Sequence, residues 1–192
     1  MSYMNEQAAA QLLALARAAI QHGLEHPQPM PLDLQRYPPA YRERAACFVT
    51  LHKAGDLRGC VGTLHAYQAL ALDIVEHAHG AAFADPRFAR VSAQELASLH
   101  IEVSILGPAS AIAFTSEADL LRQLVPFTDG LTLAGLGHNA TFLPQVWQQL
   151  SEPRDFLAHL KIKAGLPPTA ITPALKAYRY AVESFSEHEF PS

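Results

Sequence analysis

A chain of 192 residues, 49% hydrophobic and 17% charged, can bury the core of one domain or of two closely packed subdomains. Its net charge of −4 and its lack of a lysine and arginine cluster argue against a protein that holds nucleic acid by neutralising phosphates. No run reaches the ~18 apolar residues of a membrane span, and the N-terminus lacks the basic start and apolar core of a signal peptide. These features predict a cytoplasmic protein without membrane partners.

The N-terminal part of the chain predicts a helix followed by an extended arm. Residues 5–22 are rich in alanine and leucine, with Asn5 as the capping residue and Gly23 as the stop. The segment 26–41 carries five prolines, which exclude a regular element. Three apolar residues are expected to anchor this arm to the surface: Leu32, Leu34 and Tyr37.

A β-hairpin is predicted next, with strands over 46–53 and 57–64 around a turn at 54–56. In the simplest register, Thr50 lies opposite Cys60 and His52 lies opposite Arg58. The chain has only one other cysteine, Cys47, and this register directs it to the other face of the ribbon. A disulfide is therefore disfavoured, and the cysteine count fits a reducing compartment.

The rest of the chain alternates short helices and strands. The expected elements are a helix over 69–84, a helical turn opened by the capping-box residues 92–95, a strand over 99–106, a helix over 116–124, strands over 131–133 and 140–143, helices starting at 144 and 151–153, and a last strand over 176–185. A hairpin followed by a helix occurs twice in this order. This pattern favours an α+β fold of antiparallel sheets flanked by helices over a doubly wound parallel sheet.

The stretch 57–63 is the most informative for function. It places Cys60 between Gly59 and Gly62 and beside Arg58. Glycine lacks a Cβ, so a ligand or another segment of the chain can come close to the backbone here. The stretch is either a nucleophilic site or a structural hairpin that buries a small thiol.

If Cys60 is catalytic, its thiolate is the nucleophile and Arg58 stabilises the negative charge. His52 across the hairpin, or His65 just beyond it, would then act as the base. Each histidine has the alternative of an ordinary surface residue. Thr50, opposite Cys60, is expected beside the thiol.

Three further polar residues are candidates for the same site. Glu102 lies on the polar face of the strand 99–106 and either contributes a carboxylate or forms a salt bridge with Arg58 or Arg87. Asp85 and Gln145 lie at loop or helix edges, where ligand contacts are frequent. Asp85 has the alternative of capping a turn.

Motifs for the common cofactors are absent from the sequence. It holds no phosphate loop, nucleophile elbow, zincin helix or dinucleotide fingerprint. His77 and His79 are two residues apart and do not share a helix face, while a glycine and a proline interrupt the helix around His22 and His26. No cofactor and no metal site is therefore predicted.

Seven segments, in chain order, carry a resemblance to a known family: 48–51, 57–63, 85–88, 101–104, 129–131, 141–146 and 163–166. Together they resemble the AMMECR domain family, and the match runs from about Gln7 to Phe185 as one domain within 1–192. The resemblance implies an α+β fold with a larger and a smaller subdomain and an internal duplication. It also implies a candidate active-site cysteine, which maps onto Cys60.

In prokaryotes, proteins of this kind resemble the A component of a system with a Memo-like protein and a radical SAM protein. Two hypotheses of function follow. The chain is either a thiol-dependent enzyme or substrate-activating subunit that acts on a small molecule with those partners, or a non-catalytic adaptor that presents the same groove to a protein or ligand.

Overall fold

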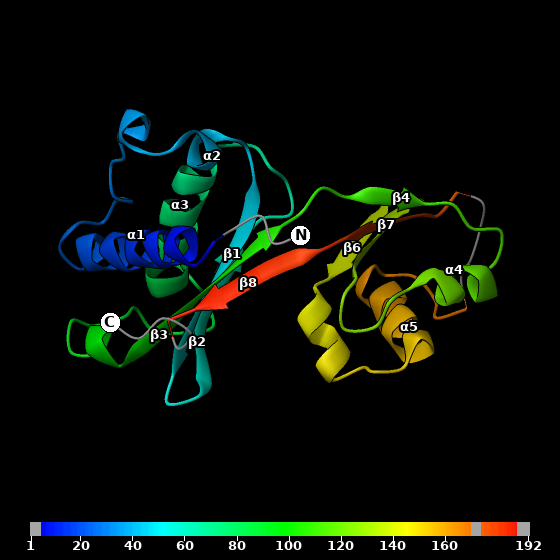
Figure 1. The fold of residues 1–192 in the computed structure, drawn as a ribbon. Coiled ribbons are helices and arrows are strands. Elements are labelled where there is room, and N and C mark those ends of the chain that lie inside the picture. The colour runs from blue at the N-terminus through cyan, green and yellow to red at the C-terminus, as the bar shows by residue number, and fades with distance from the viewer. Residues whose placement is uncertain (1–4, 170–173, 188–192) are drawn as a thin grey trace. The chain divides into compact units, whose positions relative to one another are not determined.

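The computed structural model describes residues 5–169 and 174–187, which form two compact units (Figure 1). The first unit takes in the chain up to Leu106 and the segment from Glu183 onward, and the second unit spans Gly107–Val182. Each unit has a four-stranded sheet and a hydrophobic core of its own. The predicted α+β fold with antiparallel sheets and flanking helices is therefore confirmed.

The sheet of the first unit has the strand order β2-β1-β3-β8. Its strands are β1 (Ala46–Lys53), β2 (Asp56–Gly62), β3 (Leu99–Leu106) and β8 (Val182–Ser186). Helices α1 (Glu6–Glu25) and α3 (Leu70–Phe83) pack against each other and against this sheet (Figure 1). Alternate residues of β1 and β3 enter the shared core: Val49, Leu51, Ile101 and Val103.

Helix α1 begins where the sequence predicts, because the Asn5 side chain accepts a hydrogen bond from the Ala8 N–H at 2.8 Å. Its predicted end at Gly23 is wrong, since the helix continues to Glu25. A Cβ at Gly23 would overlap the ring of Phe83 on α3. This glycine therefore lets two helices approach closely and does not stop the first.

The proline-rich arm contains only short helical turns, η1 (Leu34–Arg36) and α2 (Pro39–Arg42). The predicted anchors Leu32, Leu34 and Tyr37 pack against the core of the first unit. After α3, the loop leads through the 3₁₀ turn η2 (Leu96–Ser98) into β3. Here the Glu95 carboxylate accepts the Ser92 N–H at 3.1 Å, as the predicted capping box requires.

The second unit has the strand order β4-β7-β5-β6, with β4 (Ser110–Ile112), β5 (Gly130–Gly135), β6 (His138–Phe142) and β7 (Lys176–Tyr180). Its helices are α4 (Glu117–Gln123), the 3₁₀ helix η3 (Pro144–Gln148) and α5 (Pro153–Lys163). Strand β4 has no counterpart among the predicted elements. Trp147 and Phe156 are fully buried, and their rings stack with centroids 3.7 Å apart. They lie in the core of the second unit.

The predicted last strand over 176–185 is wrong in one respect. The chain breaks at Ala181 into β7, which joins the sheet of the second unit, and β8, which joins the sheet of the first. The Gly107 N–H donates to the Ala181 carbonyl at 2.8 Å beside this break. Within the described residues, no helix is long and apolar enough to cross a membrane.

Replacing Gly59 by alanine should lower the free energy of unfolding by about 1–3 kcal/mol. A Cβ on this β2 residue would overlap the backbone carbonyl oxygen of Ala81 on α3, which cannot rotate away. Chemical denaturation measures the change.

Gly80→Ala, on α3 at the same interface, is the matched control. Its methyl would meet a side-chain carbon of Val61 at 3.1 Å, and a gain of up to about 1 kcal/mol in helix propensity offsets the crowding. Equal losses in the two variants would contradict the close approach of helix and strand.

Candidate functional site

Cys60 lies on β2 opposite Thr50 of β1, and Thr50 in turn pairs with Glu102 of β3. Directly opposed residues of antiparallel strands share one face of the sheet, so these three side chains form a row across it. The Thr50 hydroxyl donates to the Cys60 sulfur at 3.4 Å. Cys60 itself is half-buried.

Further polar side chains extend this row. His52 Nε2 lies 4.0 Å from the Glu102 carboxylate, and the Ser104 hydroxyl donates to that carboxylate at 3.4 Å. Ser104 also shares a 2.8 Å hydrogen bond with Ser184 of β8. The residues Thr50, His52, Cys60, Glu102, Ser104 and Ser184 are hereafter the polar sheet face. The structure thus confirms the predicted pairing of Cys60 with Thr50, and it places Glu102 and His52 on the same face of the sheet.

The outer edge of β2 is covered at Cys60 by the loop that follows α3. The Cys60 N–H donates to the Asp85 carboxylate at 2.9 Å, and Arg87 donates to the Cys60 carbonyl at 3.3 Å. Arg87 also donates to both Asp85 oxygens, at 3.0 and 2.7 Å. These contacts satisfy backbone groups that an edge strand would otherwise leave unpaired. Asp85 therefore caps the strand edge and the turn.

Arg87 is the cation of this site. Its hydrogen bonds, with those of the Cys60 and Arg87 N–H groups, hold the pKa of Asp85 well below its usual range. The pKa of Arg87 is raised, chiefly by its hydrogen bond to Asp85 and to a smaller degree by its interaction with Cys60. A negative charge on the Cys60 sulfur would thus develop beside a fixed guanidinium.

The predicted position of Arg58 is wrong, and a β-bulge is the reason. The β1–β2 register shifts between Leu51 and His52, so His52 pairs with Leu57 and Arg58 is the extra residue. Arg58 donates to the Glu95 carboxylate at 3.1 and 3.2 Å. It is held there rather than beside His52.

The Glu95 carboxylate forms ion pairs with two cations at this end of the hairpin, Arg58 and Lys53. Lys53 Nζ lies 2.9 Å from the same carboxylate. Arg58 and Lys53, with the Ser92 N–H, hold the pKa of Glu95 well below its usual range. The expected alternative of a salt bridge from Glu102 to Arg58 or Arg87 is also wrong, since those arginines pair with Glu95 and Asp85.

The glycines around Cys60 are approached by the chain itself. The space beside Gly59 holds the Ala81 carbonyl oxygen, and the space beside Gly62 holds the Phe48 ring and the Cys47 carbonyl. The structure thus gives both glycines a packing role, and it offers no room for a ligand at these two positions.

Two other sequence candidates, Gln145 and His65, are not among the residues of the polar sheet face. Gln145 is on η3 in the second unit, whereas the remaining candidates lie in the first. His65 follows β2, where it is exposed and its backbone N–H donates to the Thr63 hydroxyl at 3.2 Å. Within the first unit, His65 has no described contact with Cys60.

Some roles were not predicted from the sequence. Arg87 was expected only as a possible salt-bridge partner of Glu102, although its spacing two residues after Asp85 is typical of a loop ion pair. Asp73 and His77 are four residues apart on α3 and so share a face, and Cys47 of β1 lies beside them. The hydrogen bond of Ser104 to Ser184 joins positions 80 residues apart and leaves no local signal.

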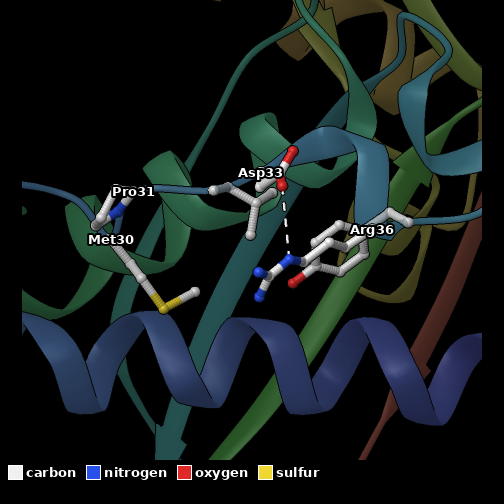
Figure 2. A pocket seen from close by; sticks show the side chains of 6 residues that line it. Met30, Pro31, Asp33 and Arg36 are labelled. Carbon is white, nitrogen blue, oxygen red and sulfur yellow. Dashed lines mark ion pairs between the residues drawn. The ribbon is translucent and has the colours of Figure 1, made fainter.

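A shallow pocket of about 540 Å³ lies along the proline-rich arm and is lined by Met30, Pro31, Leu32, Asp33, Arg36 and Tyr37. In Figure 2 the Met30 side chain extends toward α1, and Asp33 faces Arg36 across a 3.5 Å ion pair. None of the sequence candidates for catalysis lines this pocket. The pocket along the arm is therefore not part of the polar sheet face.

Comparisons with known proteins extend over nearly the whole chain. The AMMECR1 family model matches residues 13–185. Protein MJ0810 of Methanocaldococcus jannaschii is 35% identical over 178 residues, which cover 91% of this chain and 87% of the relative. A protein of Methanothermobacter thermautotrophicus is 35% identical over 180 residues, or 92% of each chain. The crystal structure of the uncharacterized protein PH0010 from Pyrococcus horikoshii matches with a TM-score of 0.85 and 30% identity, over 95% of this chain and 93% of its own.

Glu95→Gln should lower the free energy of unfolding at pH 7 by about 2–3 kcal/mol, because Arg58 loses its charged partner. The Arg58 side chain is only 14% exposed. Since the folded pKa of Glu95 lies below that of an unfolded glutamate, about 4.3, this stabilisation is complete above that value. It is lost as the pH falls through the folded pKa. Urea denaturation at several pH values should show a constant difference from pH 7 to about 5 and a shrinking one below about 4.

Asp33→Asn is the control for this ion pair. Asp33 and Arg36 are both highly exposed, so this change should cost less than about 0.5 kcal/mol. A difference between Glu95→Gln and the wild type that grows in acid would contradict the assigned ion pair.

Proposed function

This chain belongs to the AMMECR1 family, and we propose that it is a thiol-dependent enzyme or substrate-activating subunit in which Cys60 is the nucleophile. The substrate class is a small molecule with an electrophilic carbon. The names of these relatives state no reaction. The proposal therefore rests on the chemistry of the polar sheet face.

The observation that carries the proposal is the setting of the Cys60 thiol. It is half-buried, it accepts a hydrogen bond from Thr50, and the Arg87 guanidinium is fixed at its backbone carbonyl. Reactive cysteines need access and a neighbouring positive charge that favours the thiolate. Cys47 offers the contrast: it is fully buried, and that burial raises its pKa well above the usual value.

Each neighbour has a role in the proposed step. The Cys60 thiol gives up its proton to His52, and its sulfur bonds to the substrate carbon while the leaving group departs with the bonding electrons. Glu102, 4.0 Å from His52, stabilises the imidazolium that forms. Arg87 and Thr50 stabilise the sulfur before it attacks. Arg87 thus takes the role that the sequence suggested for Arg58.

We also propose, from the family resemblance, that a Memo-like protein and a radical SAM protein are its partners. In that arrangement the chain would hold or activate the substrate for them. The alternative function is an adaptor, which would bind the same partners with the Cys60 thiol removed. Pull-down of both candidate partners with the wild type and with Cys60→Ala tests this proposal. The adaptor function predicts that Cys60→Ala binds the partners as well as the wild type does. A wild-type chain that binds neither partner contradicts both functions.

Iodoacetamide at neutral pH should alkylate Cys60 in the folded protein and leave Cys47 unmodified until the protein unfolds. Arg87→Gln should slow the modification of Cys60 several-fold, because it removes the positive charge beside the sulfur that favours the thiolate. Mass spectrometry of the peptides that contain each cysteine gives both rates in one experiment.

Arg36→Gln, which removes an exposed arginine of the arm, should leave the Cys60 rate unchanged. If Cys60 resists alkylation as strongly as Cys47 does, the nucleophile assignment fails and the adaptor is favoured. If Cys60 is alkylated equally slowly in the Arg36 and Arg87 variants, the effect of charge on the rate is general and Arg87 has no special role.

A further inference from the structure

Three buried side chains of the first unit converge at a second site, between α3 and β1. Cys47 lies on β1, and Asp73 and His77 occupy successive turns of α3. One sulfur, one carboxylate oxygen and one imidazole nitrogen all lie within 4.8 Å of one another. His77 Nδ1 is 3.8 Å from the Cys47 sulfur and 3.2 Å from Asp73 Oδ2.

The basic side chain described beside the Asp73 carboxylate of this cluster is His77, at 3.2 Å. Asp73 and Cys47 are 0% exposed and His77 is 5% exposed. Among the described residues, no lysine or arginine contacts the Asp73 carboxylate; its partners are the Cys47 N–H, the Gln68 amide and His77. Burying a carboxylate is costly unless a cation accompanies it. A cation at the centre of the cluster would supply that charge.

The spacing of the three atoms fits a tetrahedral metal. With a Zn–S bond of about 2.3 Å and a Zn–N bond of about 2.1 Å, neighbouring ligand atoms are about 3.3–3.6 Å apart. The observed separations of 3.2 and 3.8 Å lie within a few tenths of an ångström of that range. The third separation, between the Cys47 sulfur and the Asp73 carboxylate, is at most 4.8 Å.

The surrounding contacts already orient the carboxylate. Asp73 Oδ2 accepts the Cys47 N–H at 2.9 Å, and Oδ1 accepts the Gln68 amide at 3.2 Å. Hydrogen bonds of this kind fix the ligands of metal sites from outside the coordination sphere.

We propose that Cys47, Asp73 and His77 bind a divalent transition metal of the Zn²⁺ class, with a water molecule as the fourth ligand. Sulfur and imidazole ligands select such ions over Mg²⁺ and Ca²⁺, which prefer oxygen. On binding, the Cys47 sulfur loses its proton to solvent and bonds to the metal. Thiolate and carboxylate then carry two negative charges against the two positive charges of the ion, so the buried site becomes neutral.

This metal site is independent of the proposed role of Cys60. Cys47 and Cys60 lie on opposite faces of the hairpin, because Cys47 belongs to the buried alternation of β1 and Cys60 pairs with Thr50 of the other alternation. The metal would join α3 to β1 on the core side of the sheet. Loss of Cys60 reactivity would leave it intact.

The test is a Co²⁺ titration of chelator-treated, reduced protein without oxygen. The wild type and Cys60→Ala should develop a thiolate-to-cobalt charge-transfer band with the visible bands of four-coordinate Co²⁺, and Zn²⁺ should abolish both. Cys47→Ala should lose the charge-transfer band, and Asp73→Asn and Gln68→Leu should bind Co²⁺ at least about tenfold more weakly.

Thermal unfolding with Zn²⁺ provides a second measurement that does not require the Cys47 variant to fold. The ion should raise the Tm of the wild type and of Cys60→Ala, and it should have a much smaller effect on Asp73→Asn. The proposal is overturned if the wild type shows no charge-transfer band, or if the band survives in Cys47→Ala and disappears in Cys60→Ala. In the first case, the cluster is a buried Asp73 and His77 ion pair.

Discussion

The Asp85 carboxylate joins two parts of the first unit through a small set of hydrogen bonds. It accepts the backbone N–H of Cys60 at the sheet edge, and it holds the Arg87 guanidinium, which in turn reaches the Cys60 carbonyl. The loop after α3 is thereby tied to the outer strand β2. The same contact gives Cys60 a fixed backbone, a neighbouring cation and an edge that cannot recruit another strand. The geometry of the polar sheet face depends on this carboxylate.

Local patterns gave much of the fold but not the places where distant segments meet. The bounds of β1, the Asn5 cap and the pairing of Thr50 with Cys60 follow from alternation and capping chemistry, and the structure has them. Gly23 has the composition of a helix stop, yet its role is set by Phe83, 60 residues away. The division of the last strand at Ala181 could not be predicted either, because the side chains of both halves show the same alternation of polar and apolar residues.

The candidate site was predictable to the same extent. Strand alternation placed Thr50 opposite Cys60 and put Glu102 on the polar face of its own strand, but it could not show that β3 pairs with β1 and brings Glu102 beside Thr50. The cation near Cys60 is Arg87 and not the predicted Arg58, because Arg58 is the extra residue of a β-bulge. A bulge cannot be recognised from the alternation of apolar residues. The cluster at Cys47 could not be predicted for another reason. Cys47 lies 26 residues before Asp73, and only the tertiary fold brings the two residues together.

The placement of the two cysteines on opposite faces of one hairpin also governs how the protein responds to oxidants. A half-buried thiol such as Cys60 can be oxidised to a sulfenic acid, which is normally resolved by a second cysteine nearby. Cys47 is the only other cysteine in the chain, and the sheet separates the two sulfur atoms. An oxidised Cys60 must therefore be recovered by a small thiol or by another protein, so its redox state follows the surrounding thiol pool.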